Sequence, residues 1–222
     1  MVVEHRWDLE PGEAVALQKD LRKQIDVSVP LNLDDVELVA GVDVSVKNDI
    51  SRAAVVVMSY PELATVETET AAIPTPFPNI SGLLTFREGE VILEAWSKLQ
   101  HKPDAVIFDG QGYAHPRRLG IATHMGLWLD VPTAGCGKTK LVGTIEGELP
   151  EEKGSSKPLT HRGEQVGYLL RTRTRVKPVY VSAGHLMTHE AARTLVLSCT
   201  TRYRLPEPIR AADRLAGQFL AK

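Results

Sequence analysis

The stretch LVAGVDVSV, residues 38–46, limits the fold of this chain more than any other part of the sequence. Successive side chains of an extended strand point to opposite faces, so every second residue from Leu38 onward forms one wholly apolar face. The opposite face carries small side chains and a single acid, Asp43. Because burying a lone carboxylate is costly, the pattern predicts a sheet strand whose acid has hydrogen-bond donors, an arginine or a metal ion as its partner.

The order of the other elements predicts a mixed α/β sheet flanked by helices. Hydrophobic periodicity and turn residues predict strands at 38–46, 53–60, 64–73, 105–109 and 131–135, a hairpin at 164–184, and helices around 14–25, 89–100, 119–130, 188–199 and 207–220. Antiparallel strands thus precede alternating helices and strands, which is typical of a mixed sheet. The polar stretch EGELPEEKGSSKP, residues 146–158, predicts a surface loop.

Composition predicts one soluble domain that spans residues 1–222. The chain has 43% hydrophobic and 24% charged residues, and its start carries no long apolar run, so we expect no membrane span. Two cysteines without a CxxC spacing predict neither a zinc site nor a disulfide framework, which favours the reducing cytoplasm. A net charge of −2 argues against a protein that binds nucleic acid over its whole surface, but it allows a local basic cleft.

The stretch PTAGCGKTK, residues 132–140, resembles the end of a nucleotide-binding phosphate loop. That loop requires a glycine at the position of Pro132, which has no N–H to donate to a phosphate. The sequence that follows Thr139 is also a poor continuation into a long helix. We therefore reject nucleotide triphosphate binding, which leaves Lys138 either as a surface lysine or as a contact to another phosphate.

Four acids are candidate metal ligands. Asp109 follows a buried strand at the end where open α/β sheets bind ligands, and Glu88 is predicted just before a helix. Asp213 falls at the margin of the apolar stripe of the last helix. Each acid alone has an ordinary explanation as a turn residue, a helix-dipole partner or an ion pair. Together with Asp43 they indicate a site of hard oxygen ligands, which suits magnesium or manganese rather than zinc.

The chain resembles the endonuclease V family, the deoxyinosine-directed nucleases of the ribonuclease H-like fold. The resemblance covers nearly the whole chain, and its long central motif is specific. The matching motifs are GVDVSV from Gly41, GLLTFRE from Gly82, DGQGYAHPRRLGIATHMGLWLDVPTAGCGKTKLVG from Asp109, VSAGHLMTHEAA from Val181 and YRLPEPIRAADRLAG from Tyr203.

The resemblance implies a single ribonuclease H-like domain that binds Mg²⁺, with Mn²⁺ as a substitute. The family's metal ligands fall on Asp43, Glu88 and Asp109, its C-terminal metal-side residue falls on Asp213, and its lysine falls on Lys138. The implied activity is DNA repair: a nick near a deaminated base, deoxyinosine or inosine, one bond beyond the lesion on its 3′ side. The products carry 3′-hydroxyl and 5′-phosphate ends. We expect a cytoplasmic monomer.

Nucleic-acid contacts follow from the same motifs. The expected contact residues are Asn79, Ile80, Gly82, Gly112, His115, Arg117, Arg118 and Lys138. Arginines at 171, 173 and 175 alternate along a predicted strand and either follow phosphates or face solvent. The family's wedge tyrosine, which fills the gap left by an extruded base, is replaced by Asn79. Phe77 stands nearby but is displaced in register, and it is the alternative candidate for the wedge.

The sequence leaves three hypotheses about function open. The first is a metal-dependent nuclease that acts on deaminated DNA or RNA. The second is a ribonuclease H-like nuclease with altered or relaxed substrate choice, for other lesions, mismatches, flaps or inosine-containing RNA. The third is a non-catalytic nucleic-acid binding module, which the intact acids disfavour.

Overall fold

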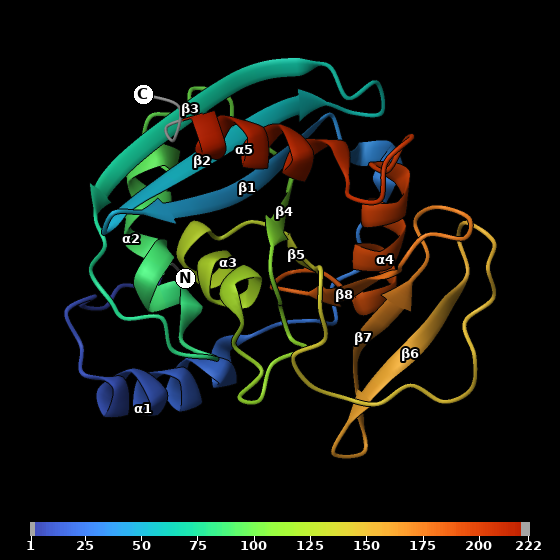
Figure 1. Ribbon diagram of the computed structural model, residues 1–222, viewed down its shortest axis with the longest axis horizontal. Coiled ribbons are helices and arrows are strands. Elements are labelled where there is room, and N and C mark those ends of the chain that lie inside the picture. Colours follow the sequence, from blue (N-terminus) through green and yellow to red (C-terminus); the bar gives the residue numbers. More distant parts are fainter. Residues whose placement is uncertain (1–2, 219–222) are drawn as a thin grey trace.

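The computed structural model describes residues 3–218, which form one eight-stranded sheet with helices on both faces (Figure 1). The strands are β1 (Leu38–Lys47), β2 (Ile50–Ser59), β3 (Thr65–Pro74), β4 (Ala105–Asp109), β5 (Thr133–Gly137), β6 (Ser156–His161), β7 (Glu164–Leu170) and β8 (Val179–Ala183). The helices are α1 (Pro11–Leu21), α2 (Leu84–Trp96), α3 (Ile121–Leu129), α4 (His189–Ser198) and α5 (Glu207–Gly217).

The strand order is β3-β2-β1-β4-β5-β8-β7-β6, and the sheet mixes both pairing directions. β1, β4 and β5 run parallel, whereas every other neighbouring pair is antiparallel. The carboxyl ends of β4 and β5 therefore meet at one edge of the sheet, beside the second half of β1. The predicted mixed α/β sheet is confirmed.

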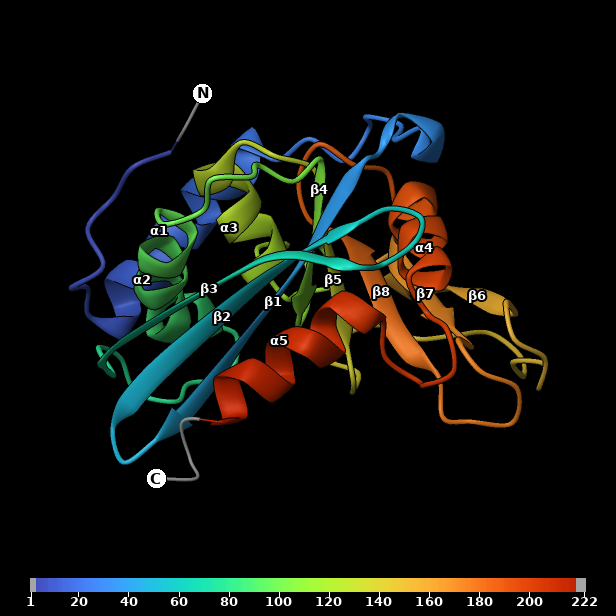
Figure 2. The ribbon, with the colours of Figure 1, turned by 90° about the horizontal axis from the view of Figure 1, so that it is seen from above.

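Two helical layers bury the two faces of the sheet (Figure 2). α4 and α5 pack on one face, in a core built around side chains such as Val39, Ile107 and Val181. α2 and α3 pack on the other face, against side chains such as Val42 and Phe108. α1 lies outside this second layer and closes a smaller cluster that includes Phe86. β1 is thus covered on both faces, and its side chains alternate between the two cores.

The packing of α5 on β1 depends on Gly41. A Cβ atom at Gly41 would lie 2.2 Å from the backbone carbonyl of Pro208 and 2.7 Å from the backbone nitrogen of Ile209. Real side chains do not approach backbone atoms this closely, so only glycine lets the first turn of α5 lie directly on the strand. The face that carries Gly41 is also the face that carries Asp43, which sets the acid beneath α5.

Several sequence predictions need correction. The stretch 146–158 is not entirely loop, because β6 begins at Ser156. Glu88 lies in the second turn of α2 and not before a helix. Arginines 171, 173 and 175 follow β7 in a bent loop, where Arg171 donates hydrogen bonds to three backbone carbonyls. The predicted extension of the last helix to Phe219 and Leu220 lies outside the described residues. Within residues 3–218, no helix has the length and apolarity to span a bilayer.

We expect Gly41→Ala to destabilise the protein by about 1–3 kcal/mol, because the new methyl group overlaps the backbone of α5. Urea denaturation measures the change in the free energy of unfolding. Gly12→Ala in α1 is the matched control, since a Cβ atom there has nothing within 4 Å and should leave stability unchanged or raise it. Equal stability of the two variants would contradict the close approach of α5 to β1.

Candidate active site

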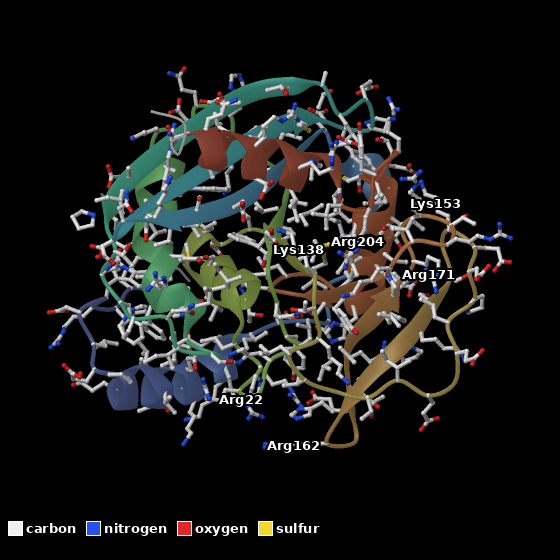
Figure 3. All side chains as sticks on the ribbon, viewed as in Figure 1. Arg22, Lys138, Lys153, Arg162, Arg171 and Arg204 are labelled. Carbon is white, nitrogen blue, oxygen red and sulfur yellow. The ribbon has the colours of Figure 1, made fainter. Side chains whose placement is uncertain are left out.

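The site is assembled where the parallel strands end. Asp109 is the last residue of β4, and Lys138 directly follows β5, the neighbouring strand. Asp43 lies in the middle of β1, on the other side of β4. Figure 3 shows Lys138 near the centre of the molecule, in front of the sheet edge. The topology therefore gathers residues that are far apart in sequence.

α5 completes a cluster of three carboxylates. Asp43, Asp109 and Asp213 each offer an oxygen, and these atoms all lie within 4.8 Å of one another. Asp43 and Asp109 are half-buried, whereas Asp213 is exposed. Asp213 stands one turn after Ile209, which is fully buried against the sheet, so the seating of α5 on Gly41 fixes the distance from Asp213 to the other two acids.

Glu88 lies in the same pocket but outside this trio. The acidic pocket has a volume of about 470 Å³, and its lining residues are Asp43, Val44, Ser45, Leu84, Glu88, Asp109, Lys138, Asp213 and Gly217. Glu88 reaches the pocket from the second turn of α2, on the opposite face of the sheet from α5. The structure thus brings together every acid that was predicted as a metal ligand, with Asp213 nearer to the centre than Glu88.

Burial and the neighbouring charges make Asp43 and Glu88 hard to ionise. Burial, reinforced by the charges of Asp109 and Asp213, raises the pKa of Asp43 to about 7. Burial, reinforced by the charges of Asp43 and Asp109, raises the pKa of Glu88 to about 8. Both carboxyls would titrate near 4 in water. The pocket therefore holds negative charge that is incompletely neutralised by the protein.

Lys138 provides part of the missing positive charge. Its Nζ donates a hydrogen bond to Oδ2 of Asp109 and forms an ion pair with it. Burial alone would lower the pKa of Lys138, but the hydrogen bond and charge of Asp109, with the charges of Asp43 and Asp213, raise it. The lysine is thus firmly protonated and directed into the acidic pocket.

The donor set fits a divalent cation that prefers oxygen ligands. Three carboxylates of separate elements converge within 4.8 Å, and a fourth lies in the same pocket. Carboxylate oxygens without histidine or cysteine ligands suit Mg²⁺ or Mn²⁺. A bound cation would also offset the burial and the neighbouring charges that raise the pKa of Asp43.

The backbone around Lys138 is fixed by two side chains. The Gln111 amide donates to the carbonyl of Thr139 over 2.8 Å, and Arg204 donates to the carbonyl of Lys138 over 2.8 Å. Figure 3 shows Arg204 beside Lys138. A Cβ atom at Gly137 would lie 2.1 Å from the Gln111 amide nitrogen, so a larger residue there would displace the Gln111 side chain from this position. These contacts hold the lysine at a defined place relative to Asp109.

A second pocket adjoins the acidic one and is named the loop pocket here. It has a volume of about 380 Å³ and lies between the segments 79–85, 109–111, 119–121 and 137–141, with His115 also in its wall. It shares Leu84, Asp109 and Lys138 with the acidic pocket. Leu84 and Leu141 are 37% and 38% exposed, which is unusual for leucine and places apolar surface at the wall of this pocket.

One backbone carbonyl anchors the loop that forms the wall of this pocket. The carbonyl of Gly82 accepts hydrogen bonds from Gln18 over 2.9 Å, from Arg117 over 2.9 Å and from His115 over 3.0 Å. Burial and the charge of Arg117 lower the pKa of His115 to about 4, so its imidazole is neutral at physiological pH. Because Nδ1 of His115 accepts from the Arg117 N–H, its proton lies on Nε2, which donates to Gly82.

The predicted nucleic-acid contacts divide into two groups. Asn79, Ile80, Gly82 and Lys138 line the loop pocket, as does the buried His115. Gly112, Arg117 and Arg118 do not line it.

Direct nucleic-acid contacts by two of the predicted residues are not supported by this arrangement. Arg118 is 5% exposed and its guanidinium is occupied by Glu164, at 2.8 Å, and by His161. His115 is 2% exposed and is bonded to Gly82. Both side chains support the loops around the pocket from within.

Sequence analysis missed Gln111, Leu84 and Leu141 as wall residues. The DGQG motif offered a signal for Gln111, because the glycines on both sides of it indicate a backbone with a special conformation next to a strand-end acid. Leu84 and Leu141 carry no such signal, since exposed leucines cannot be told from core leucines by type.

The fold is an α/β protein with a ribonuclease H-like sheet that carries a cluster of acids able to bind a metal, and comparison with known proteins identifies the family. The sequence model of endonuclease V matches residues 19–214. Endonuclease V of Trichormus variabilis is 51% identical over 215 residues, which cover 96% of each chain. This chain belongs to the endonuclease V family and is a hydrolytic endonuclease.

Solved structures of the family are also similar. The endonuclease V structure from Streptomyces avermitilis superposes with a TM-score of 0.92 at 36% identity, covering 99% of this chain and 96% of that chain. Ciona intestinalis endonuclease V, in complex with a 24mer DNA containing an inosine followed by a ribo-adenosine, superposes with a TM-score of 0.82 at 29% identity, covering 95% of this chain and 97% of that chain.

We expect Asp43→Asn to stabilise the metal-free protein by about 1–3 kcal/mol at about pH 8. The raised pKa of Asp43 means that the folded state keeps a proton that the unfolded state has lost, so wild-type stability falls as pH rises from about 4 through about 7. The difference between variant and wild type should therefore vanish near pH 4. Chemical denaturation in EDTA at both pH values measures it.

The same variant should lose most of the stabilisation that wild type gains from added Mg²⁺, because it lacks one ligand. Asp34→Asn, at an exposed acid outside the pocket, should behave as wild type in both comparisons. An Asp43→Asn protein that is less stable than wild type at about pH 8 in EDTA would contradict the proposed charge crowding.

Proposed function

We propose that this endonuclease uses a divalent metal to cut nucleic acid one bond beyond a deaminated base, on the 3′ side of the lesion. The observation that carries the proposal is the adjacency of two pockets: the acidic pocket and the loop pocket share Leu84, Asp109 and Lys138. One pocket has the ligands for phosphodiester hydrolysis, and the other offers a partly apolar space beside it. The DNA complexes of the Ciona intestinalis protein, which contain an inosine, support this substrate class.

Asp43, Asp109 and Asp213 would hold the metal, with Glu88 completing the ligand set. When bound, the ion supplies a nucleophilic water at neutral pH and neutralises charge on the phosphoryl oxygens. Lys138 directs a fixed positive charge into the same pocket, where it orients the scissile phosphate or the attacking water. Mg²⁺ is the proposed ion, and Mn²⁺ is expected to replace it. The products are a 3′-hydroxyl and a 5′-phosphate.

The loop pocket is proposed to receive the extruded base. Its volume of about 380 Å³ lies within the ~300–1,000 Å³ typical of small-ligand sites. Exposed Asn79 stands at the position of the family's wedge tyrosine and lines this pocket. Phe77 does not replace the wedge, because it is 5% exposed and packs on Phe86 with ring centres 5.8 Å apart.

The proposed enzyme acts as one domain and as a monomer in the cytoplasm. A single sheet runs through the described part of the chain, which supports one domain. The natural substrate is DNA or RNA with a deaminated base. Parallel assays on deoxyinosine DNA and inosine RNA of the same sequence distinguish these two substrates.

We expect Asp109→Ala to lower the nicking rate on the order of 10³-fold, because it removes a metal ligand. Lys138→Ala should lower it by about 10²-fold, as loss of one electrostatic contact does. The assay uses labelled strands with inosine, uracil, an abasic site or a mismatch, in Mg²⁺ and without ATP. Asp34→Asn is the exposed control. A wild-type rate in the Asp109→Ala variant, or no cleavage of any deaminated strand by wild type, would refute the proposed function.

Restoring the aromatic wedge should improve cleavage of duplex substrates. Stacking of a base on an aromatic ring is worth ~1–3 kcal/mol, and asparagine forfeits most of it. Extruding a base from a duplex costs a few kcal/mol, so we expect Asn79→Tyr to raise cleavage of inosine duplexes by about 5-fold or more. Single strands, which need less unstacking, should gain less.

Asn79→Ala is the matched control for this prediction, because it changes the side chain without adding a ring. It should leave the ratio of duplex to single-strand cleavage near the wild-type value. Equal gains on duplex and single strand in the Asn79→Tyr variant would show that position 79 does not act as a wedge.

A further inference from the structure

A third pocket continues the acidic pocket on the side of α5. It is named the arginine pocket, has a volume of about 490 Å³, and is lined by Tyr203, Arg204, Leu205, Arg210, Asp213 and Arg214. It shares Asp213 with the acidic pocket and no residue with the loop pocket. The three pockets therefore form one series: loop pocket, acidic pocket, arginine pocket.

Tyr203 brings an aromatic ring into this pocket, and the Arg210 guanidinium covers one face of that ring. Tyr203 is 42% exposed, and the Arg210 guanidinium lies 3.4 Å from the centre of its ring. Arg210 is itself held by Glu207, over 2.7 Å. Among the described residues, the exposed large apolar side chains are Val66, Leu84, Leu141 and Tyr203. All but Val66 line one of the three pockets. The Tyr203 ring therefore adds exposed apolar surface to the arginine pocket, as Leu84 and Leu141 do to the loop pocket.

The charges around Tyr203 fit a phosphodiester strand. Arg202 places its guanidinium 5.5 Å from the ring centre. Arg214 lines the pocket from the exposed side of α5, and within residues 3–218 its guanidinium forms no ion pair or hydrogen bond. Arg204, by contrast, donates from Nε and Nη2 to the carbonyls of Lys138, Lys177 and Pro178. An aromatic ring with free cations beside a cleavage site is the arrangement that binds single-stranded nucleic acid.

We propose that Tyr203 and Arg214 form a subsite for the first nucleotide on the 3′ side of the cut, with its base on the open face of the Tyr203 ring and the phosphate on its own 3′ side near Arg214. This inference rests on the proposed function, since it places the lesion in the loop pocket and the scissile bond in the acidic pocket. The strand then passes the three pockets in series. The ligand is a nucleotide of any base, because stacking does not discriminate strongly among bases.

The test measures KM and kcat on single strands that carry deoxyinosine and differ only after the cut. One strand has a normal nucleotide in the first position, and the other has an abasic sugar there. With the normal strand, Tyr203→Ala should raise KM by about 5- to 150-fold, equivalent to ~1–3 kcal/mol of stacking, with little change in kcat. Wild type should show a similar rise on the abasic strand, whereas Tyr203→Ala should show no further loss.

Two comparisons separate this subsite from a general structural role. Tyr203→Phe should retain the wild-type KM, because it keeps the ring. Tyr168→Ala and Arg193→Ala are matched controls, since this second tyrosine–arginine pair, 5.5 Å apart on β7 and α4, lines none of the three pockets. Arg214→Ala should raise KM and reduce its dependence on salt, as loss of a phosphate contact does.

A wild-type KM for Tyr203→Ala and Arg214→Ala, in an enzyme that cleaves deoxyinosine strands, would overturn the subsite and leave the proposed function intact. If Tyr203→Ala fails to fold, wild type alone decides: equal KM for the normal and abasic strands overturns the proposal. Absence of cleavage by wild type on every deaminated strand would instead refute the proposed function itself.

Discussion

The mutual repulsion of Asp43, Asp109 and Asp213 is the constraint on which the active site depends. Three carboxylates whose oxygens lie within 4.8 Å of one another oppose folding when they ionise, so other contacts must hold the elements that carry them. β1 and β4 are held by their parallel pairing, and α5 is held by apolar side chains and by its contact with Gly41. The core thus stabilises a cluster that would otherwise separate.

The repulsion is relieved locally by Lys138 but not removed. Its ion pair with Asp109 neutralises one carboxylate, while burial and the remaining charges still raise the pKa of Asp43 to about 7. A pocket with this residual charge favours a small divalent cation over a second lysine, since a metal ion can be coordinated by several carboxylate oxygens at once.

Much of the scaffold was predictable from the sequence, because β1 and β4 have apolar patterns that report burial directly. Asp43 and Asp109 could be located for the same reason: each interrupts such a pattern. Asp213 could be suspected but not placed, since its distance from Asp43 depends on how α5 crosses β1. That crossing follows from a glycine contact between residues far apart in sequence.

The errors have identifiable physical causes. The start of α2 was missed because its N-cap is Leu83, which makes no side-chain cap, so Glu88 was assigned to the preceding loop. The burial of Arg118 was missed because a buried arginine depends on a partner, here Glu164, that only the tertiary structure supplies. β6 was missed because its residues are mostly polar and half-exposed at the edge of the sheet.

Lys138 has the most flexible side chain among the catalytic candidates, and two other side chains hold the backbone around it. A lysine side chain has many rotamers, so its charge is useful only if the stem starts from a fixed point. Gln111 and Arg204 fix that point from segments far apart in sequence, one from the loop after β4 and the other from the segment before α5. The first segment directly follows Asp109, and the second leads into the helix that carries Asp213. The backbone at Lys138 is therefore tied to the same segments that adjoin two of the carboxylates. These contacts keep the charge of Lys138 at a fixed place beside Asp109. Electrostatic catalysis requires charged groups that are already in position before the reaction begins.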